Sequence, residues 1–241
     1  MTPDEAVMSR AMRELWGLAD DGRRGPKPAT SVRAIAAAGV ELADTEGVDA
    51  VTMAAVAARL GFTTMALYRY VESRQDLLVA MVDEALGPPP EPNRRRGWRA
   101  QVEAWARADA AQLFAHPWVL EVRTGSPPIG PHVLAWMESG FAALAKSGLP
   151  PGRVADALLI VDGYVRSSVQ LALQYAAPGA TDTWVQTLRA VLDEDRFPRV
   201  HAVLESGAFE DDSLGGGPSG TFEFGLALVL DGIDRLVHDT A

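Results

Sequence analysis

The chain has 241 residues, of which 48% are hydrophobic and 22% charged, a composition typical of a globular protein with one large domain or two smaller ones. It contains no cysteine, which excludes disulfides, thiolate metal sites and thiol catalysis and fits a reducing compartment. A formal net charge of −10 argues against binding nucleic acid through overall charge, so any DNA binding has to come from a local arrangement.

Neither a membrane span nor a secretory signal is expected. No run of about 18 uncharged apolar residues is present, which is the length that a spanning helix needs. The first ten residues, MTPDEAVMSR, are acidic and lack an apolar segment. We therefore expect a cytoplasmic protein without membrane contact.

The first 30 residues predict a short helix followed by a basic, flexible arm. Thr2-Pro3-Asp4-Glu5 is typical of a helix start, with threonine as N-cap and proline at the first helical position, and the helix should run to about Trp16. Residues 20–28 are rich in turn formers and lack an apolar face. Two interpretations of the arm are open: a solvated tether, or an arm that contacts phosphates or the minor groove. Its cations are Arg23, Arg24 and Lys27.

Residues 31–86 predict four helices with clear start and stop signals. The first runs from Ser31 to a stop at Gly47, and Thr52 caps the second, which ends at Gly61. Thr63 caps a third helix of about eight residues. Ser73 with Asp76 resembles a capping box for a fourth, which should end near residue 86.

A helix, a tight glycine turn and a very short helix form a helix-turn-helix arrangement. Leu67 and Val71 lie four residues apart and should point into the core. Hydroxyl groups reach base edges or phosphates, methyl groups pack on the thymine methyl, and arginine binds phosphate or guanine. Aromatic residues on a helix more commonly pack in a core, but the caps and the glycine turn favour a DNA-reading face. The outward face carries Thr64, Met65, Tyr68, Arg69 and Tyr70.

The segment TMAAVAARLGFTTMALYRYVESRQDLL, residues 52–78, resembles the DNA-binding segment of the TetR family of bacterial transcriptional repressors. The resemblance covers residues 31–86 and implies groove contacts by Thr64, Met65, Tyr68 and Tyr70, with Arg69 in the groove-facing region. It implies phosphate contacts by Thr52 and Arg74, and we add Thr63 at the start of the same short helix. Between residues 22 and 74, Lys and Arg exceed Asp and Glu by only two, so DNA affinity should depend strongly on salt and on pairing of two subunits.

A proline-rich segment, residues 87–92, predicts the boundary of a second domain over 87–241. The cluster Arg94-Arg95-Arg96 follows it, and a solvated cluster is favoured over DNA contact because cations at a helix start oppose the dipole. HPWVLEV, LAWMESGF, VDGYVR and FEFGL resemble the C-terminal domain of tetracycline repressors. Seven helices are predicted, near 96–115, 117–123, 130–147, 151–177, 182–193, 197–206 and 219–238.

The helices near 151–177 and 219–238 carry long apolar stripes, which suit either an internal bundle or a homodimeric four-helix bundle. The family resemblance favours the homodimer. A dimer also has a physical motive, because two recognition helices related by a twofold axis read half-sites about 34 Å apart.

Aromatic and polar side chains on three of these helices predict a pocket for a small-molecule effector, although any one of them is more commonly a core residue. By rough register the positions that hold magnesium–tetracycline in the tetracycline repressors are Val122 and Leu171, which argues against that ligand. The candidate ligand residues are Trp105, Gln112, His116, Trp136, Tyr164, Arg166 and Gln170.

An enzyme is not expected. The four histidines have no metal-ligand spacing, no phosphate loop or nucleophile motif is present, and neither metal nor cofactor is predicted. Asp109 and His116 lie two helical turns apart, too far for an acid–base pair. The sequence therefore predicts an all-α, two-domain regulator, a repressor by resemblance, that binds a palindromic operator as a homodimer and is released by a small molecule. The alternative is a helical enzyme or protein-interaction module that keeps a helix-turn-helix without sequence-specific DNA binding.

Overall fold

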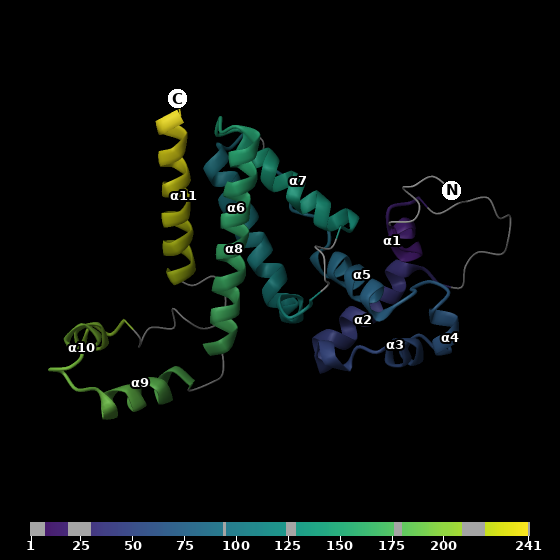
Figure 1. Ribbon diagram of the computed structural model, residues 1–241, viewed down its shortest axis with the longest axis horizontal. Coiled ribbons are helices and arrows are strands. Elements are labelled where there is room, and N and C mark those ends of the chain that lie inside the picture. Colours follow the sequence, from purple (N-terminus) through teal and green to yellow (C-terminus); the bar gives the residue numbers. More distant parts are fainter. Residues whose placement is uncertain are drawn as a thin grey trace. The chain divides into compact units, whose positions relative to one another are not determined.

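The computed structural model describes residues 8–18, 30–93, 95–123, 129–175, 180–208 and 220–240. Within that part of the chain every regular element is a helix and no strand occurs (Figure 1). The predicted all-α fold is confirmed. The elements are α1 (Arg10–Leu15), α2 (Val32–Glu46), η2 (Val48–Ala50), α3 (Met53–Arg59), α4 (Thr64–Leu67), α5 (Arg74–Leu86), α6 (Trp98–Ala115), η3 (Pro117–Leu120), α7 (Pro131–Ala145), α8 (Pro151–Tyr175), α9 (Ala180–Val191), α10 (Pro198–Glu205) and α11 (Gly220–Thr240).

The described residues form two compact units that do not follow the chain order. The first takes residues up to 96 together with 115–143, and the second takes 97–114 together with the residues from 144 onward. The predicted domain boundary near residue 87 stays a prediction, and the first compact unit also includes η3 and most of α7. Long-range hydrogen bonds hold η3 and α7 to the first unit, and no local sequence pattern predicts them.

The core of the first unit lies between α2 and α5, with α1 packed against both. Its side chains recur at helical spacing, as in Val32 and Ile35 of α2 and Leu77 and Met81 of α5, all fully buried. The two helices meet at a glycine. A Cβ on Gly39 would lie 2.6 Å from Met81 Sδ, so only glycine lets α2 approach α5 this closely.

Two carboxylates join η3 and α7 to this core. Asp44 of α2 accepts a hydrogen bond from Trp118 Nε1 at 2.7 Å, and its Oδ1 lies 2.9 Å from His116 Nδ1. Asp83 of α5 is fully buried, and its Oδ1 accepts from the main-chain N–H groups of His132 and Val133 at 2.8 and 3.0 Å. Asp83 thus caps α7 from 49 residues away, satisfying donors that a helix start leaves unpaired.

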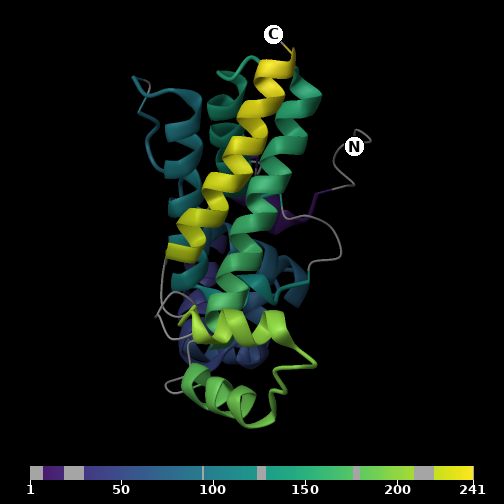
Figure 2. The same cartoon turned by 90° about the vertical axis from the view of Figure 1, so that its left-hand side faces the viewer.

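The second unit contains the longest helices, α8 and α11, which lie side by side and run antiparallel (Figures 1 and 2). Predicted core positions Val161 and Val165 of α8 and Leu226 and Leu230 of α11 are almost completely buried. Tyr164 locks the pair, since its hydroxyl donates to Phe222 O at 2.8 Å and its ring lies where a side chain on Gly225 would be.

Three local predictions need correction. The first helix was predicted to start at Thr2, but Ser9 is the N-cap of α1, where it accepts from Met12 N; residues 2–5 lie outside the described part. The predicted helix over 117–123 is a 3-10 turn, η3. The arginine cluster precedes α6 instead of starting it, because the helix begins at Trp98, and Arg94 lies outside the described residues.

Candidate nucleic-acid interface and ligand sites

Local hydrogen bonds build the helix-turn-helix as the sequence predicted. Thr52 Oγ1 accepts from Ala55 N at 3.1 Å and Thr63 Oγ1 from Ala66 N at 3.2 Å, so each hydroxyl caps its helix. Between the two helices Gly61 has φ of +72°, a left-handed conformation that a Cβ would strain.

The recognition segment is shorter than predicted. Only Thr64–Leu67 is α-helical. Hydrogen-bonded turns follow as far as Val71, and the N–H groups of Tyr70 and Val71 both bond to Leu67 O. Leu67 and Val71 are fully buried, as predicted. Since these two side chains fix the segment from inside, the residues between them are turned outward.

The outward face matches the predicted set. Met65 is 75% exposed, Tyr68 and Arg69 are also exposed, and Thr64 and Tyr70 are half-buried. Within the described part of the chain the Arg69 guanidinium has no hydrogen-bond or ion-pair partner. The face therefore offers hydroxyls, a methyl-bearing thioether and one free cation, a mixture that suits base edges as well as phosphates.

Arg74 has main-chain partners that the sequence did not reveal. Its Nε donates to Val51 O at 2.8 Å and its Nη2 to Val48 O at 3.0 Å. The side chain thereby ties the first residue of α5 to the segment that leads into α3. A phosphate contact by the same exposed guanidinium stays a prediction.

Other cations of the first unit are paired at the surface. Arg33 bonds to Glu84 at 3.1 Å and Arg59 to Glu41 at 3.2 Å. These pairs reduce the positive charge that is free to attract phosphates, which leaves Arg69 as the cation at the centre of the face. The arm residues Arg23, Arg24 and Lys27 lie outside the described residues, so their role stays a prediction.

The seven candidate ligand residues divide between the two units. His116 and Trp136 belong to the first, where His116 faces Asp44 and the Trp136 Nε1 donates to Gly87 O at 2.9 Å. In the second, Tyr164 bonds to α11 and the Nε of Arg166 donates to Asp162 at 2.9 Å. Trp105 is buried, Gln112 half-buried and Gln170 exposed. His116, Trp136, Tyr164 and Arg166 therefore already have polar partners within their own units, and the role of all seven residues towards a ligand stays a prediction.

Asp109 is a buried carboxylate that the sequence reasoning undervalued. It lies on α6, is only 4% exposed, and its Oδ2 has no hydrogen-bond partner among the residues that the structure describes. Burial, together with the nearby Asp162, raises the pKa of Asp109 to about 7, and Arg166 partly opposes that shift. The available signal was a carboxylate at a position of α6 where the helical period places apolar residues such as Trp105 and Leu113.

Comparison with known proteins identifies the chain. The model described as "Tetracyclin repressor-like, C-terminal domain" matches residues 90–237, and that of "Bacterial regulatory proteins, tetR family" matches residues 35–81. A repressor from Streptomyces coeruleorubidus, the HTH-type transcriptional repressor DrrR1, is 36% identical over 98% of this chain and 89% of its own length. The chain belongs to the TetR family.

Solved structures of the family agree with this fold. A possible TetR family regulator from Streptomyces coelicolor A3(2) superposes with a TM-score of 0.67 and 28% identity, covering 85% of this chain and 99% of its own. The S. coelicolor protein ActR, solved in complex with actinorhodin, superposes with a TM-score of 0.72 over 87% of this chain and 99% of its own. At 22% identity ActR supports the fold alone. The chain thus has the DNA-binding helix-turn-helix and the helical C-terminal region of TetR-family transcriptional regulators.

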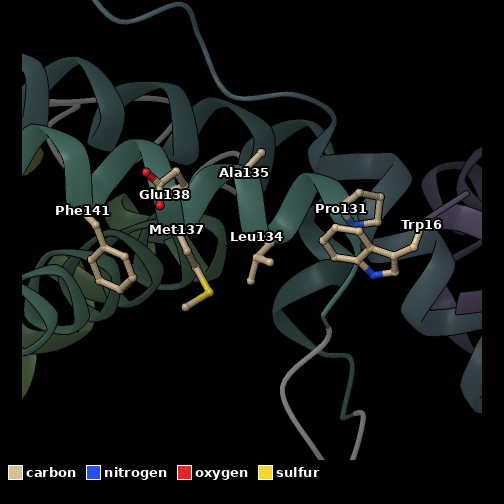
Figure 3. A pocket seen from close by; sticks show the side chains of 7 residues that line it. All are labelled: Trp16, Pro131, Leu134, Ala135, Met137, Glu138 and Phe141. Atoms are coloured by element: carbon tan, nitrogen blue, oxygen red, sulfur yellow. The ribbon is translucent and has the colours of Figure 1, made fainter. Parts of the chain in front are cut away.

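Two properties of the described helices bear on partners. None of them is long and apolar enough to cross a membrane. On the first unit, an open hollow of about 370 Å³ runs along α7 and is closed at one end by Trp16 (Figure 3). It is lined by Trp16, Pro131, Leu134, Ala135, Met137, Glu138 and Phe141, none of which was among the predicted ligand residues.

Proposed function

We propose that this TetR-family protein is a repressor that binds a palindromic operator as a homodimer and leaves it when a small molecule binds the C-terminal region. The observation that carries the proposal is the recognition segment. Leu67 and Val71 are fully buried, while Met65 before Leu67 and Tyr68 and Arg69 between the two anchors are exposed. A face so short and so firmly anchored suits the major groove, where three or four side chains read base edges.

Base reading is favoured over phosphate binding on this face. Of its side chains only Arg69 is charged, and Arg33 and Arg59 of the same unit are engaged by glutamates. The start of each neighbouring helix supplies main-chain N–H groups that can meet phosphates, at Thr52, Thr63 and Ser73. Specificity then depends on the fit of the face, and affinity on a second subunit.

The dimer is supported by the surfaces of α8 and α11. Besides the stripes that bury against each other, both helices expose large apolar side chains, including Leu159 and Ile160 of α8 and Phe224 and Leu228 of α11. A second copy would cover them in a four-helix bundle and set two recognition segments about 34 Å apart.

The effector is proposed to be a small organic molecule bound among the α6 and α8 side chains. ActR, a structural relative, was solved with actinorhodin, which shows what that protein binds and supports only the expectation of some small molecule. Binding would move α5 and alter the separation of the recognition segments. Such coupling requires that effector and DNA each weaken the binding of the other to the same degree. No cofactor is needed for this function.

Selection of bound duplexes from a random DNA library tests the proposal. We expect enrichment of an inverted repeat, bound tightly at low salt and released as salt rises. Met65→Ala and Tyr68→Phe should each weaken binding of the selected duplex by about tenfold and relax the preference at one position of each half-site. Met137→Ala removes another exposed methionine, from α7, and should leave binding unchanged. Enrichment of no sequence at low salt would favour the alternative, a helical module that does not bind DNA.

A further inference from the structure

The helix α1 precedes the helix-turn-helix and is held to three separate parts of the first unit. Ala11 and Met12 are buried against the unit, and α1 packs on both α2 and α5. Three of its side chains then reach outward, each to a different segment. A helix of six residues has little stability of its own, so these contacts fix its position.

The first contact reaches the recognition segment. Arg10 Nη1 donates a hydrogen bond to Arg69 O at 2.8 Å, across 59 residues of chain. Arg69 lies in the turns that follow α4, and carbonyl groups at a helix end lack intrahelical partners. A guanidinium there supplies a donor and complements the negative end of the helix dipole. Arg10 thus holds the main chain beside the one free cation of the DNA-reading face.

The second contact reaches the start of α2, and the third reaches the segment before α7. Glu14 Oε1 accepts from Val32 N at 2.8 Å, which caps α2 in addition to Ser31. Trp16 Nε1 donates to Ile129 O at 2.9 Å, immediately before α7. Its ring lies beside Pro131, the first residue of α7 (Figure 3).

These contacts define a second route between α7 and the recognition segment. The first route runs through α5, whose Asp83 caps α7 and whose Arg74 holds the approach to α3. The second runs from the start of α7 through Trp16 and Arg10 to Arg69 O, and its two hydrogen bonds include no residue of α5. A displacement of the start of α7 would therefore pull on the recognition segment directly.

From this geometry we infer that α1 is a strut for DNA recognition, with Arg10 and Trp16 as positioning residues that fix the recognition segment and connect it to the start of α7. The inference rests on the proposed function. It assigns Arg10 no contact with DNA: the side chain acts through the main chain of Arg69.

The test uses the full-length protein and the duplex that the wild type selects from a random library. Arg10→Met keeps much of the side-chain length and removes the hydrogen bond. We expect a loss of about tenfold in affinity with an unchanged slope of affinity against salt, because no phosphate contact is lost. We also expect about tenfold faster amide exchange at Tyr70 and Val71, whose N–H groups bond to Leu67 O.

Further variants separate the contributions. Trp16→Phe keeps the ring and removes the donor, so it should accelerate exchange at the same two amides by a smaller factor. Arg10→Lys, which keeps a cationic donor, should recover part of the affinity. Arg33→Met removes the same charge from α2 and should leave exchange at Tyr70 and Val71 unchanged.

Two results would overturn the inference. Unchanged exchange at Tyr70 and Val71 in Arg10→Met would show that the contact does not hold the segment. A salt slope reduced by about one would show that Arg10 is a phosphate contact. If instead the wild type selects no duplex, the proposed function fails, and the exchange measurements still decide whether α1 holds the recognition segment.

Discussion

The recognition segment and the α8–α11 pair are both anchored by buried apolar side chains, and they differ in the chemistry of their exposed side chains. Each is anchored by apolar residues at helical spacing, Leu67 and Val71 in one and Val161 and Val165 in the other. Outside, the recognition segment presents a thioether, hydroxyls and a cation, whereas α8 presents Leu159 and Ile160. The anchors decide how a helix sits on its own unit, and the outward chemistry indicates whether the partner is DNA or protein.

The two units also differ in how they treat a buried carboxylate. Among the described residues the Oδ2 of both carboxylates lacks a hydrogen-bond partner. Asp83 in the first unit nevertheless accepts two main-chain hydrogen bonds through Oδ1 and lies 3.4 Å from His132 Nδ1, whereas burial raises the pKa of Asp109 in the second unit to about 7. One carboxylate organises a helix start. Burial destabilises the charged form of Asp109, so the folded protein favours its protonated form.

A charge on the exposed apolar surface of α8 tests whether this surface binds a second subunit, and it should have the largest effect. Ile160 is 58% exposed, so Ile160→Glu should leave the subunit folded but destroy the proposed dimer. Without the second recognition segment, affinity for the palindromic duplex should fall by about 10² to 10⁴. Light scattering at micromolar concentration should report a monomer, and a titration with the selected duplex should report the lost affinity.

Leu18→Glu is the matched control, because Leu18 is equally exposed, at 58%, and lies in the first unit. It should remain a dimer. A dimeric Ile160→Glu protein, or a monomeric wild type, would contradict the proposed interface.

Removing the carboxylate of Asp83 tests whether this buried group stabilises the first unit by capping α7. Asp83→Ala leaves the half-buried N–H groups of His132 and Val133 without this acceptor, so the free energy of unfolding should fall by about 2 kcal/mol. Asp83→Asn keeps an acceptor oxygen and should lose much less. Urea denaturation of the three proteins gives the comparison, and an equal loss for both variants would show that the charge, and not the cap, is what the fold needs.

The pH dependence of stability tests whether the buried Asp109 of the second unit is protonated in the folded protein. Because the folded pKa of about 7 lies above the ordinary aspartate value of 3.8, the folded state binds the proton more tightly, and stability falls as pH rises between those values. Asp109→Asn is uncharged at every pH. At pH 8 it should therefore gain about 4 kcal/mol relative to the wild type, compared with their difference at pH 4.

The measurement is urea denaturation of both proteins at pH 4 and pH 8. Asp156→Asn on α8 is the control, since Asp156 is exposed and pairs with Arg153 at the surface. It should show a far smaller change between the two pH values. A wild type that differs from Asp109→Asn equally at both would mean that Asp109 is charged in the folded protein, with a partner that binding or rearrangement supplies.

The helix-turn-helix could be predicted because its signals are local. Thr52, Thr63 and Ser73 each cap a helix through a main-chain N–H three residues ahead, and Gly61 turns the chain between two of those helices. Such contacts depend on neighbours in sequence, so the residue pattern specifies them. Helical period likewise placed Leu67 and Val71 inside, and the boundaries of α6 to α11 within a few residues.

The sites that depend on distant partners could not be predicted in this way. Arg74 reaches back to Val48 and Val51, and Trp136 reaches Gly87, because packing brings those carbonyls within range. The predicted ligand residues show the same limit. Aromatic and polar residues at helical spacing suit a pocket and a core equally, and only the fold reveals that Tyr164 bonds to α11.

By itself the sequence determined an all-helical protein with a capped helix-turn-helix and an outward face of mixed chemistry, since period and capping act over three or four residues. Tertiary structure alone decided that Asp83 caps a helix 49 residues away, that Asp109 is buried, and that Arg10 holds the carbonyl of Arg69. The physical reason is that a hydrogen bond requires proximity in space, and the chain brings such residues together only when its apolar stripes have packed.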